Sequence, residues 1–391
     1  MELSTLDWGV IVGFMAISAG LGVVASRRAG KSFSEYFLAG GTMSWGMLGL
    51  SMVATTFGAD TPNLVTGLVR RDGVSGNWAW WAFLLTGLLT VFVYAKLWKR
   101  SGVLTDLEFY EIRYAGRSAG LLRGFRAIYL GLIFNCLVTA GVILAGIKLG
   151  SVALGASPLQ TVVVIGAVTV VYTLLGGLRG VILTDCFQFV FAMFGAIAAA
   201  YAICRRPEIG GFSNLLTHEN VVGKLELPPD LTDPKAVVPL LVIPLAVQWW
   251  SSWYPGAEPG GGGYVAQRML GAKSELDATK AALLFQAAHY ALRPWPWIVV
   301  ALASLIAFPT LESIRQALPD ADPRIVKDDL AYPAMLGFLP SGLLGVVLAS
   351  LIAALMSTVS THLNWGASYL THDYYRRFVR PDASERELVF F

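Results

Sequence analysis

Residues 54–62 read Ala-Thr-Thr-Phe-Gly-Ala-Asp-Thr-Pro, and they interrupt an apolar segment that runs from residue 43 to residue 69. A second apolar segment begins near residue 237. It is broken by Tyr254-Pro255-Gly256-Ala257-Glu258-Pro259 and by the glycines at 260–263. In lipid, a broken helix leaves backbone groups unpaired at several kcal/mol each, unless protein or a water-filled cavity receives them. A pair of broken helices far apart in the chain therefore predicts the binding site of a secondary transporter.

The composition is that of a polytopic membrane protein. The chain has 391 residues, of which 55% are hydrophobic and 14% charged, whereas a soluble domain carries about 25% charged residues. The net charge is +3, and no basic cluster with interleaved aromatic residues indicates nucleic acid as a partner. The scattered Cys136, Cys186 and Cys204 predict neither a disulfide framework nor a zinc site. No catalytic constellation stands out, so an enzyme is not expected.

Apolar runs of about 18 residues or more mark membrane spans. Nine are predicted, over residues 7–26, 43–69, 78–98, 125–150, 159–177, 181–204, 237–264, 281–309 and 333–370. The last run is too long for one span, and we expect a turn at Pro340-Ser341-Gly342 within it. Lys and Arg are in roughly two-to-one excess on one set of connecting loops, which predicts that the N-terminus lies outside the cytoplasm.

The last predicted span carries four hydroxyl residues within five positions. Ser357, Ser360 and Thr361 share one side of a helix, and Thr358 lies one turn from the carbonyl of Ala354. Hydroxyls with backbone carbonyls form a neutral set of oxygens that suits a monovalent cation, because hard cations prefer several oxygen ligands. The alternative is that these hydroxyls bond to neighbouring helices, which is the commoner role of Ser and Thr in membranes.

Three acids and a tryptophan group are further candidates. Asp185 lies inside a predicted span, where an acid is costly and usually functional; pairing with Arg179 is the alternative. Asp60 and Glu258 lie at the two breaks, where each is equally suited to cap a helix. Trp81 belongs to a group with Trp78 and Trp80 that suits either a membrane interface or stacking on a solute.

The chain resembles the sodium:solute symporters, the family of bacterial proline, sialic acid and sugar transporters. Six stretches carry this resemblance along nearly the whole chain. They are Tyr36 to Gly41, Ala54 to Asp60, Glu108 to Tyr114, Tyr172 to Gln188, Gln267 to Ser274, and Ser357 to Asp373.

The resemblance implies an all-α, LeuT-type fold of five plus five helices in an inverted repeat, preceded by one extra span. One transporter domain is then expected over residues 1–391. Residues 1–42 hold the extra span and a cytoplasmic loop, 43–204 the first repeat, 205–236 an extracytoplasmic loop and 237–391 an incomplete second repeat. The final Leu388-Val389-Phe390-Phe391 resembles the start of a further span, so the last two helices of the second repeat are expected to be missing.

The resemblance also implies one or two coupling sodium ions. The first would be held by the carbonyls of Ala54, Phe57 and Ala354 with the hydroxyls of Ser357 and Thr358. Some family members bind a second sodium near an acid like Asp185 with hydroxyls like Ser357, Ser360 and Thr361. The candidate solute-binding residues are Asp60, Thr61, Trp81, Asn135 and Glu258. Where sugar-transporting members have Gln in the first break this chain has Thr61, so the solute is left open.

The predicted function is sodium-coupled symport of a small organic solute into the cell by alternating access. The alternative is a symporter-like sensory input domain of a membrane signalling protein. The expected partners are the solute, sodium and the lipid bilayer of the plasma membrane, with no nucleic acid and no obligate protein partner.

Overall fold

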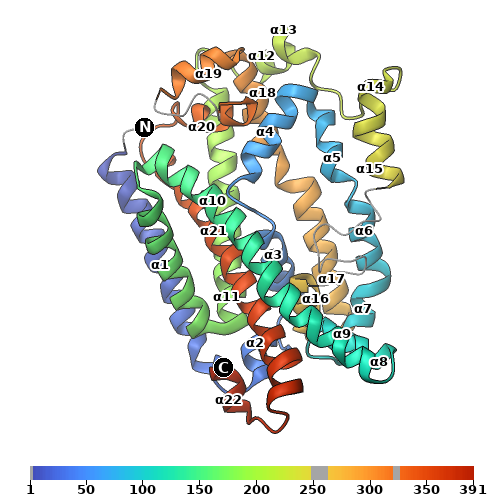
Figure 1. The fold of residues 1–391 in the computed structure, drawn as a ribbon. Helices are drawn as coiled ribbons and strands as arrows, with labels where there is room; N and C mark the ends of the chain where they lie inside the picture. Colours follow the sequence, from blue (N-terminus) through green and yellow to red (C-terminus); the bar gives the residue numbers. More distant parts are fainter. Residues whose placement is uncertain (1–2, 248–262, 320–325) are drawn as a thin grey trace.

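The protein is a helical bundle. We analysed a computed structural model that describes residues 3–247, 263–319 and 326–391. Within these residues the chain forms helices and turns, with a single isolated bridge between Met43 and Ala272. Figure 1 shows an elongated bundle whose N- and C-termini lie at opposite ends. The predicted all-α fold class is confirmed.

The N-terminal part of the chain contains two helices that precede the broken helix, and then the two halves of that broken helix. These elements are α1 (Thr5–Ala29), α2 (Phe33–Leu38), η1 (Ala39–Gly41), α3 (Trp45–Thr55) and α4 (Thr61–Asp72). The chain then continues through η2 (Val74–Asn77), α5 (Trp78–Trp81), α6 (Leu84–Leu89), η3 (Thr90–Tyr94), α7 (Ala95–Ser101), η4 (Asp106–Glu108), α8 (Phe109–Arg113), α9 (Arg117–Ile128), η5 (Tyr129–Phe134), α10 (Asn135–Leu154) and α11 (Pro158–Cys204).

The segment that follows α11 forms short helices. They are α12 (Phe212–Thr217), α13 (Glu219–Val222), α14 (Pro234–Val237), η6 (Val238–Val242) and α15 (Ile243–Ala246). The remaining elements are α16 (Gly263–Leu270), α17 (Glu275–Gln286), η8 (Ala287–Leu292), α18 (Pro294–Ala307), α19 (Leu311–Ala317), η9 (Asp328–Leu330), α20 (Ala331–Leu336), α21 (Leu343–Ser368), η10 (Tyr369–Val379) and α22 (Glu385–Phe390).

The first predicted break is confirmed. Helix α3 ends at Thr55 and α4 begins at Thr61. The amide of Phe57 donates to the carbonyl of Ala54 at 3.0 Å, which closes the last turn of α3. Pro62 lies in the first turn of α4, where its missing N–H costs no helical hydrogen bond. The second predicted break, including Glu258, lies outside the described residues for the most part.

Helix α11 is bent at Gly177, which separates the predicted spans 159–177 and 181–204. Gly177 has φ 52° and ψ −158°, a backbone conformation that favours glycine. A Cβ atom there would lie 2.6 Å from the carbonyl oxygen of Tyr36. The two arms of α11 can therefore fold back at this position, with α2 packed closely against the bend.

Five helices in the described part of the chain are long and apolar enough to cross a membrane, and a bent pair from Val74 to Ser101 would make a sixth. This number is smaller than the nine predicted spans for physical reasons. The bent α11 counts once, the halves of the broken span are 11 and 12 residues long, and the span over 237–264 runs into residues that are not described. The expected turn at Pro340-Ser341-Gly342 is present between α20 and α21.

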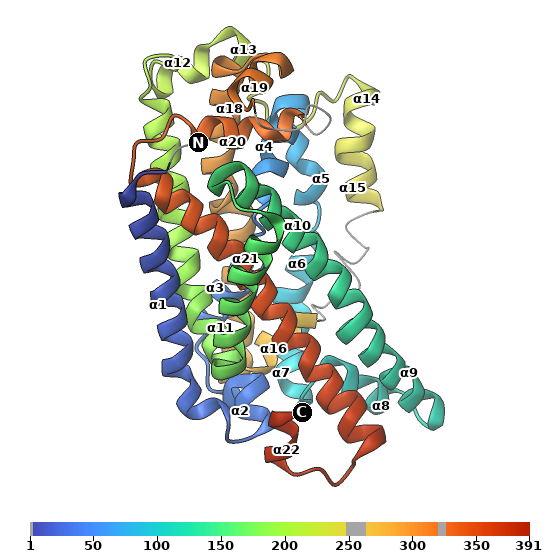
Figure 2. The same ribbon diagram turned by 60° about the vertical axis from the view of Figure 1, so that its left-hand side comes forward.

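Helix α21 is the central element of the bundle. Figures 1 and 2 both show it running diagonally between α1, α10 and α11, and most of its residues are buried. Its N-terminus is capped from α1, because Asp7 Oδ1 accepts hydrogen bonds from the amides of Gly342 (2.8 Å) and Gly345 (2.7 Å). A carboxylate there also complements the positive end of the helix dipole. These contacts fix the position of the hydroxyl residues further along α21.

Candidate functional site

The C-terminal end of α3 lies against the hydroxyl-bearing part of α21. The Thr358 hydroxyl lies 3.0 Å from the carbonyl oxygen of Thr55 and 3.0 Å from that of Ala354. One turn further along α21, the hydroxyls of Thr361 and Thr55 are 2.9 Å apart. The end of a helix presents carbonyls without helical partners and a partial negative charge. The end of α3 and the hydroxyl-bearing part of α21 are therefore in direct contact.

The predicted first sodium set lies on α3 (Ala54), two residues past the end of α3 (Phe57) and on α21 (Ala354, Ser357 and Thr358). Ser357 is 1% exposed, Ala354 2%, Phe57 4% and Thr358 6%, so their oxygens are shielded from bulk solvent. The Thr55 carbonyl is an oxygen of this region that the sequence-based prediction leaves out. A signal for it exists in the sequence, because Thr55 is the last residue before the break.

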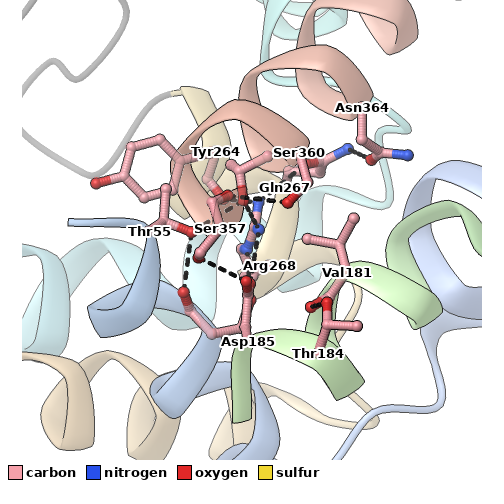
Figure 3. A network of polar contacts seen from close by, with 12 residues as sticks. Thr55, Val181, Thr184, Asp185, Tyr264, Gln267, Arg268, Ser357, Ser360 and Asn364 are labelled. Atoms are coloured by element: carbon pink, nitrogen blue, oxygen red, sulfur yellow. Dashed lines mark hydrogen bonds and ion pairs between the residues drawn. The ribbon is translucent and has the colours of Figure 1, made fainter. Parts of the chain in front are cut away.

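Asp185, on the second arm of α11, is fully buried and surrounded by polar groups (Figure 3). Its Oδ1 accepts a hydrogen bond from Ser357 at 2.6 Å, and its Oδ2 accepts one from Ser51 at 2.6 Å. Arg268 on α16 approaches Oδ2 at 3.6 Å and donates to the Thr361 hydroxyl at 2.6 Å. One buried network thus contains a carboxylate, a guanidinium and hydroxyls from two helices.

The alternative pairing of Asp185 with Arg179 is wrong. Arg179 donates to the carbonyl of Ala39 (3.0 Å) and to the hydroxyl of Thr42 (2.7 Å). Asp185 meets Arg268 instead, because Arg179 follows the bend of α11 closely and its side chain is used to hold the segment that leads into α3.

Ser51 and Arg268 belong to this network although the sequence analysis does not place them there. Ser51 lies one turn before Thr55 on α3, so a search for hydroxyls at helical spacing would have found it. Arg268 lies in the stretch 267–274 that carries the family resemblance, but its partner is 83 residues earlier in the chain. Only the packing of α16 against α3 and α21 brings Arg268 to Asp185.

A cavity of about 630 Å³ lies beside the first break. Most of its lining comes from α4, α10, η9 and α20, and it includes the exposed Asp60 together with Asn63 and Tyr332. Figure 1 places α4 and α20 in the half of the bundle that holds the N-terminus. Asp60 makes no side-chain cap on α4, so its carboxylate is available to face this cavity.

Three other candidate solute residues are not among the described residues that line this cavity. Thr61 is the first residue of α4. Trp81 ends α5 and contacts Trp78 and Trp80, with ring centroids 6.0 Å apart in each case. Asn135 is buried and donates to the backbone carbonyl of His362 at 2.7 Å, so in this structure it joins α10 to α21.

An unwound helix, a buried acid and hydroxyl and carbonyl oxygens gathered inside a bundle of apolar helices are typical of a secondary transporter of the broken-helix class. A family model of the "Sodium:solute symporter family" matches residues 36–391. The chain belongs to the sodium:solute symporter family, which consists of sodium-coupled transporters and not of enzymes.

Similar proteins of known name agree with this membership. A sodium/glucose cotransporter of Vibrio parahaemolyticus is 27% identical, and the match covers 99% of this chain and 72% of that protein. A sodium/mannose cotransporter of Bos taurus is 26% identical over 99% of this chain and 66% of its own length. A sodium/glucose cotransporter 4 of Danio rerio is 26% identical, and this chain spans 60% of it. None of these similarities favours the sensory alternative.

A solved structure has the same fold. It is a Na⁺-coupled sialic acid symporter in a substrate-bound outward-open state, with a TM-score of 0.78 and 21% sequence identity. The superposition covers 100% of this chain and 79% of the other. This likeness confirms the predicted fold, and the solute named for that protein is a property of that protein.

Proposed function

We propose that this protein carries out sodium-coupled symport of a small organic solute into the cell by alternating access. The observation that carries the proposal is the contact between the end of α3 and the middle of α21, where Thr358 Oγ1 lies 3.0 Å from the Thr55 carbonyl. A cation at this junction would draw the unwound end of α3 and the hydroxyl face of α21 together, and its loss would let them separate.

The first sodium would bind among the carbonyls of Ala54, Phe57 and Ala354 and the hydroxyls of Ser357 and Thr358. These residues fit the ion in two respects. Their oxygens are neutral, so they do not bring a large excess of negative charge into the membrane, and they are buried. A half-helix C-terminus supplies the partial negative charge that coordinates Na⁺ in this class of fold.

A second sodium would bind at Asp185 with Ser357, Ser360 and Thr361. The Ser357 hydroxyl already contacts Asp185 at 2.6 Å, whereas Ser360 donates to the backbone carbonyl of Ser357 at 2.9 Å. Arg268, at 3.6 Å from the carboxylate, is a competing positive charge. Entry of sodium at Asp185 would therefore require Arg268 to move away, so the two cations would occupy the site in turn.

The energetics suit an accumulating transporter. One charge moving down a membrane potential of 100 mV releases about 2.3 kcal/mol, and a tenfold sodium gradient adds about 1.4 kcal/mol. The resulting ~3.7 kcal/mol per ion would support roughly 500-fold accumulation of a neutral solute at one-to-one coupling.

The test is uptake of labelled solutes into proteoliposomes that contain the purified protein, with external sodium or with choline in its place. We expect uptake to require sodium and to generate an inward current. Equal uptake in choline would overturn the proposal. An epitope placed before α1 and probed with a membrane-impermeant antibody would test the proposed extracytoplasmic position of the N-terminus.

A further inference from the structure

Arg293 is a buried cation beside the first helix break. It lies between η8 and α18 and is 2% exposed. Within the described part of the chain, no carboxylate oxygen approaches it within the 4.0 Å of an ion pair. A buried charge without a counter-ion is costly, and charged residues inside membrane proteins usually mark the path of a substrate or ion.

The hydrogen bonds of Arg293 use one end of its guanidinium. Nη1 donates to the Thr56 hydroxyl at 2.9 Å and approaches the Val53 carbonyl at 3.5 Å. Nε is buried without a hydrogen-bond partner, and Nη2 makes none with a described residue. The edge formed by Nε and Nη2 is the one on which a guanidinium binds a carboxylate through two parallel hydrogen bonds.

Other groups around Arg293 also converge on the helix break. His289 Nδ1 lies 2.9 Å from the same Thr56 hydroxyl, and the guanidinium lies over the Trp297 ring at 5.7 Å. Thr56 itself is the residue at which α3 unwinds.

We propose that the transported solute carries a carboxylate and that the Nε–Nη2 edge of Arg293 binds it. This inference rests on the proposed function and names its substrate class. Asp60 lies at the other end of the same break, at the start of α4, and among the described residues it forms no ion pair with Arg293.

A purely structural role for Arg293 has a different signature. Its bonds to Thr56 and Val53 would stabilise the end of α3 with a positive charge alone, and a lysine would preserve that charge. Bidentate binding of a carboxylate needs the planar fork of arginine. The substitution Arg293→Lys therefore separates the two roles.

The experiment uses pairs of compounds that differ in the carboxylate alone: L-proline with L-prolinamide, lactate with lactamide, and D-glucuronate with D-glucose. Binding to the purified full chain is measured in sodium as a shift of thermal stability, and sodium-driven uptake is measured in proteoliposomes. The variants are Arg293→Lys and Arg293→Gln, with Arg100→Gln as the matched control, since Arg100 is an exposed arginine paired with Glu275. Each variant is first checked for a monodisperse elution profile.

We expect at least one carboxylate compound, and not its partner without the carboxylate, to bind and to be taken up with sodium. Arg293→Lys should weaken its binding at least tenfold, whereas Arg100→Gln should leave it unchanged. Sodium-driven uptake of a neutral compound that is insensitive to Arg293→Lys would overturn the inference and leave symport standing. A panel with no carboxylate ligand, or unchanged affinity in Arg293→Lys, would also overturn it. Uptake of every compound without regard to sodium would instead defeat the proposed function.

Discussion

In the described part of the chain, two buried acid–arginine pairs contact the helix formed by α21 and η10, and they are built differently. At mid-helix, Asp185 and Arg268 are each 0% exposed and stand 3.6 Å apart, with Ser51 and Ser357 bonded to the carboxylate. At the far end, Arg123 Nε donates directly to Asp373 at 2.6 Å. That contact is reinforced by Glu111, which binds Arg123 Nη1 at 2.7 Å.

The two contacts differ in length and in what else binds the carboxylate. The Arg123–Asp373 contact is short and charge-assisted, so it stabilises the packing of α9 against η10. The Asp185–Arg268 contact is long, and hydroxyls already occupy the carboxylate oxygens. We call these two contacts the tight pair and the loose pair after their distances of 2.6 and 3.6 Å. Under the proposed function, a second sodium would compete with Arg268 at the loose pair. This contrast can be tested by four changes, which we take in order of decreasing effect.

Breaking the tight pair should have the largest effect. Arg123→Ala would leave the fully buried Asp373 without its counter-ion, and loss of one partner of a buried ion pair typically costs 3–5 kcal/mol. We expect a strong drop in the thermal stability of the purified protein.

Two variants sharpen this result. Arg117→Ala, at an exposed position of the same helix, should leave the stability unchanged. The double variant Arg123→Met with Asp373→Leu should recover part of the loss, because it removes both buried charges. If Arg123→Ala were as stable as the unmodified protein, the Arg123–Asp373 pair would not contribute to the stability of the fold.

Removing the neutral oxygens beside the loose pair should affect sodium more than folding. Ser357→Ala combined with Thr358→Ala should raise the sodium concentration for half-maximal uptake at least tenfold, which corresponds to about 1.4 kcal/mol. Sodium titration of solute uptake provides the measurement. The control is Ser350→Ala, a buried serine on α21 whose hydroxyl donates to Val347 alone. A double variant that keeps the original sodium dependence would eliminate this site.

Neutralising the acid of the loose pair should have a smaller effect on the sodium affinity, which is measured separately from any stability lost because Arg268 keeps its buried charge. Asp185→Asn preserves the shape of the side chain but removes the charge that would hold a second sodium. We expect a roughly threefold rise in the half-saturating sodium concentration, or ~0.7 kcal/mol, and a Hill coefficient for sodium that falls toward one.

The same titration can contradict the second site. A Hill coefficient of one in the unmodified protein would leave no second ion to lose. Uptake that becomes insensitive to pH in Asp185→Asn, with sodium dependence unchanged, would indicate that Asp185 carries a proton. Asp230→Asn, in an exposed loop, serves as the control.

The sequence predicts the parts of this site that are local in the chain. The break after Thr55 is marked by Gly58 and Pro62, and the hydroxyls of α21 fall at helical spacing, so the residues of each segment are enough to place both elements. The resemblance to symporters then indicates that these two elements meet, which is a long-range contact that no periodicity within either segment contains.

The rest depends on packing that single segments do not encode. Asp185 can be singled out as an intramembrane acid, but the choice between Arg179 and Arg268 as its partner depends on the bend at Gly177 and on the position of α16. Asn135 is a candidate for the solute by sequence, yet its amide bonds to α21, because a polar residue in a membrane helix must find a partner wherever the neighbouring helix offers one.

Removing the charge of Glu111, which lies beside the Arg123–Asp373 pair, should have the smallest effect on stability, and this effect should depend on pH. Glu111 binds Arg377 Nη2 at 2.9 Å as well as Arg123, and these hydrogen bonds, that from Arg377 first, lower the pKa of Glu111 below its ordinary value of 4.5. A carboxyl whose pKa is lower in the folded state stabilises the fold above the unfolded pKa, and this contribution disappears as the pH falls through the folded pKa. Because Glu111 is partly exposed, its contribution to stability should be only about 0.5 kcal/mol.

The thermal stabilities of the unmodified protein and Glu111→Gln should therefore differ at pH 7 and converge below about pH 4.5. The control is Glu312→Gln, at an exposed position of α19, which should show no comparable convergence. A difference that persists or widens in acid would mean that Glu111 acts through its shape and not through its charge.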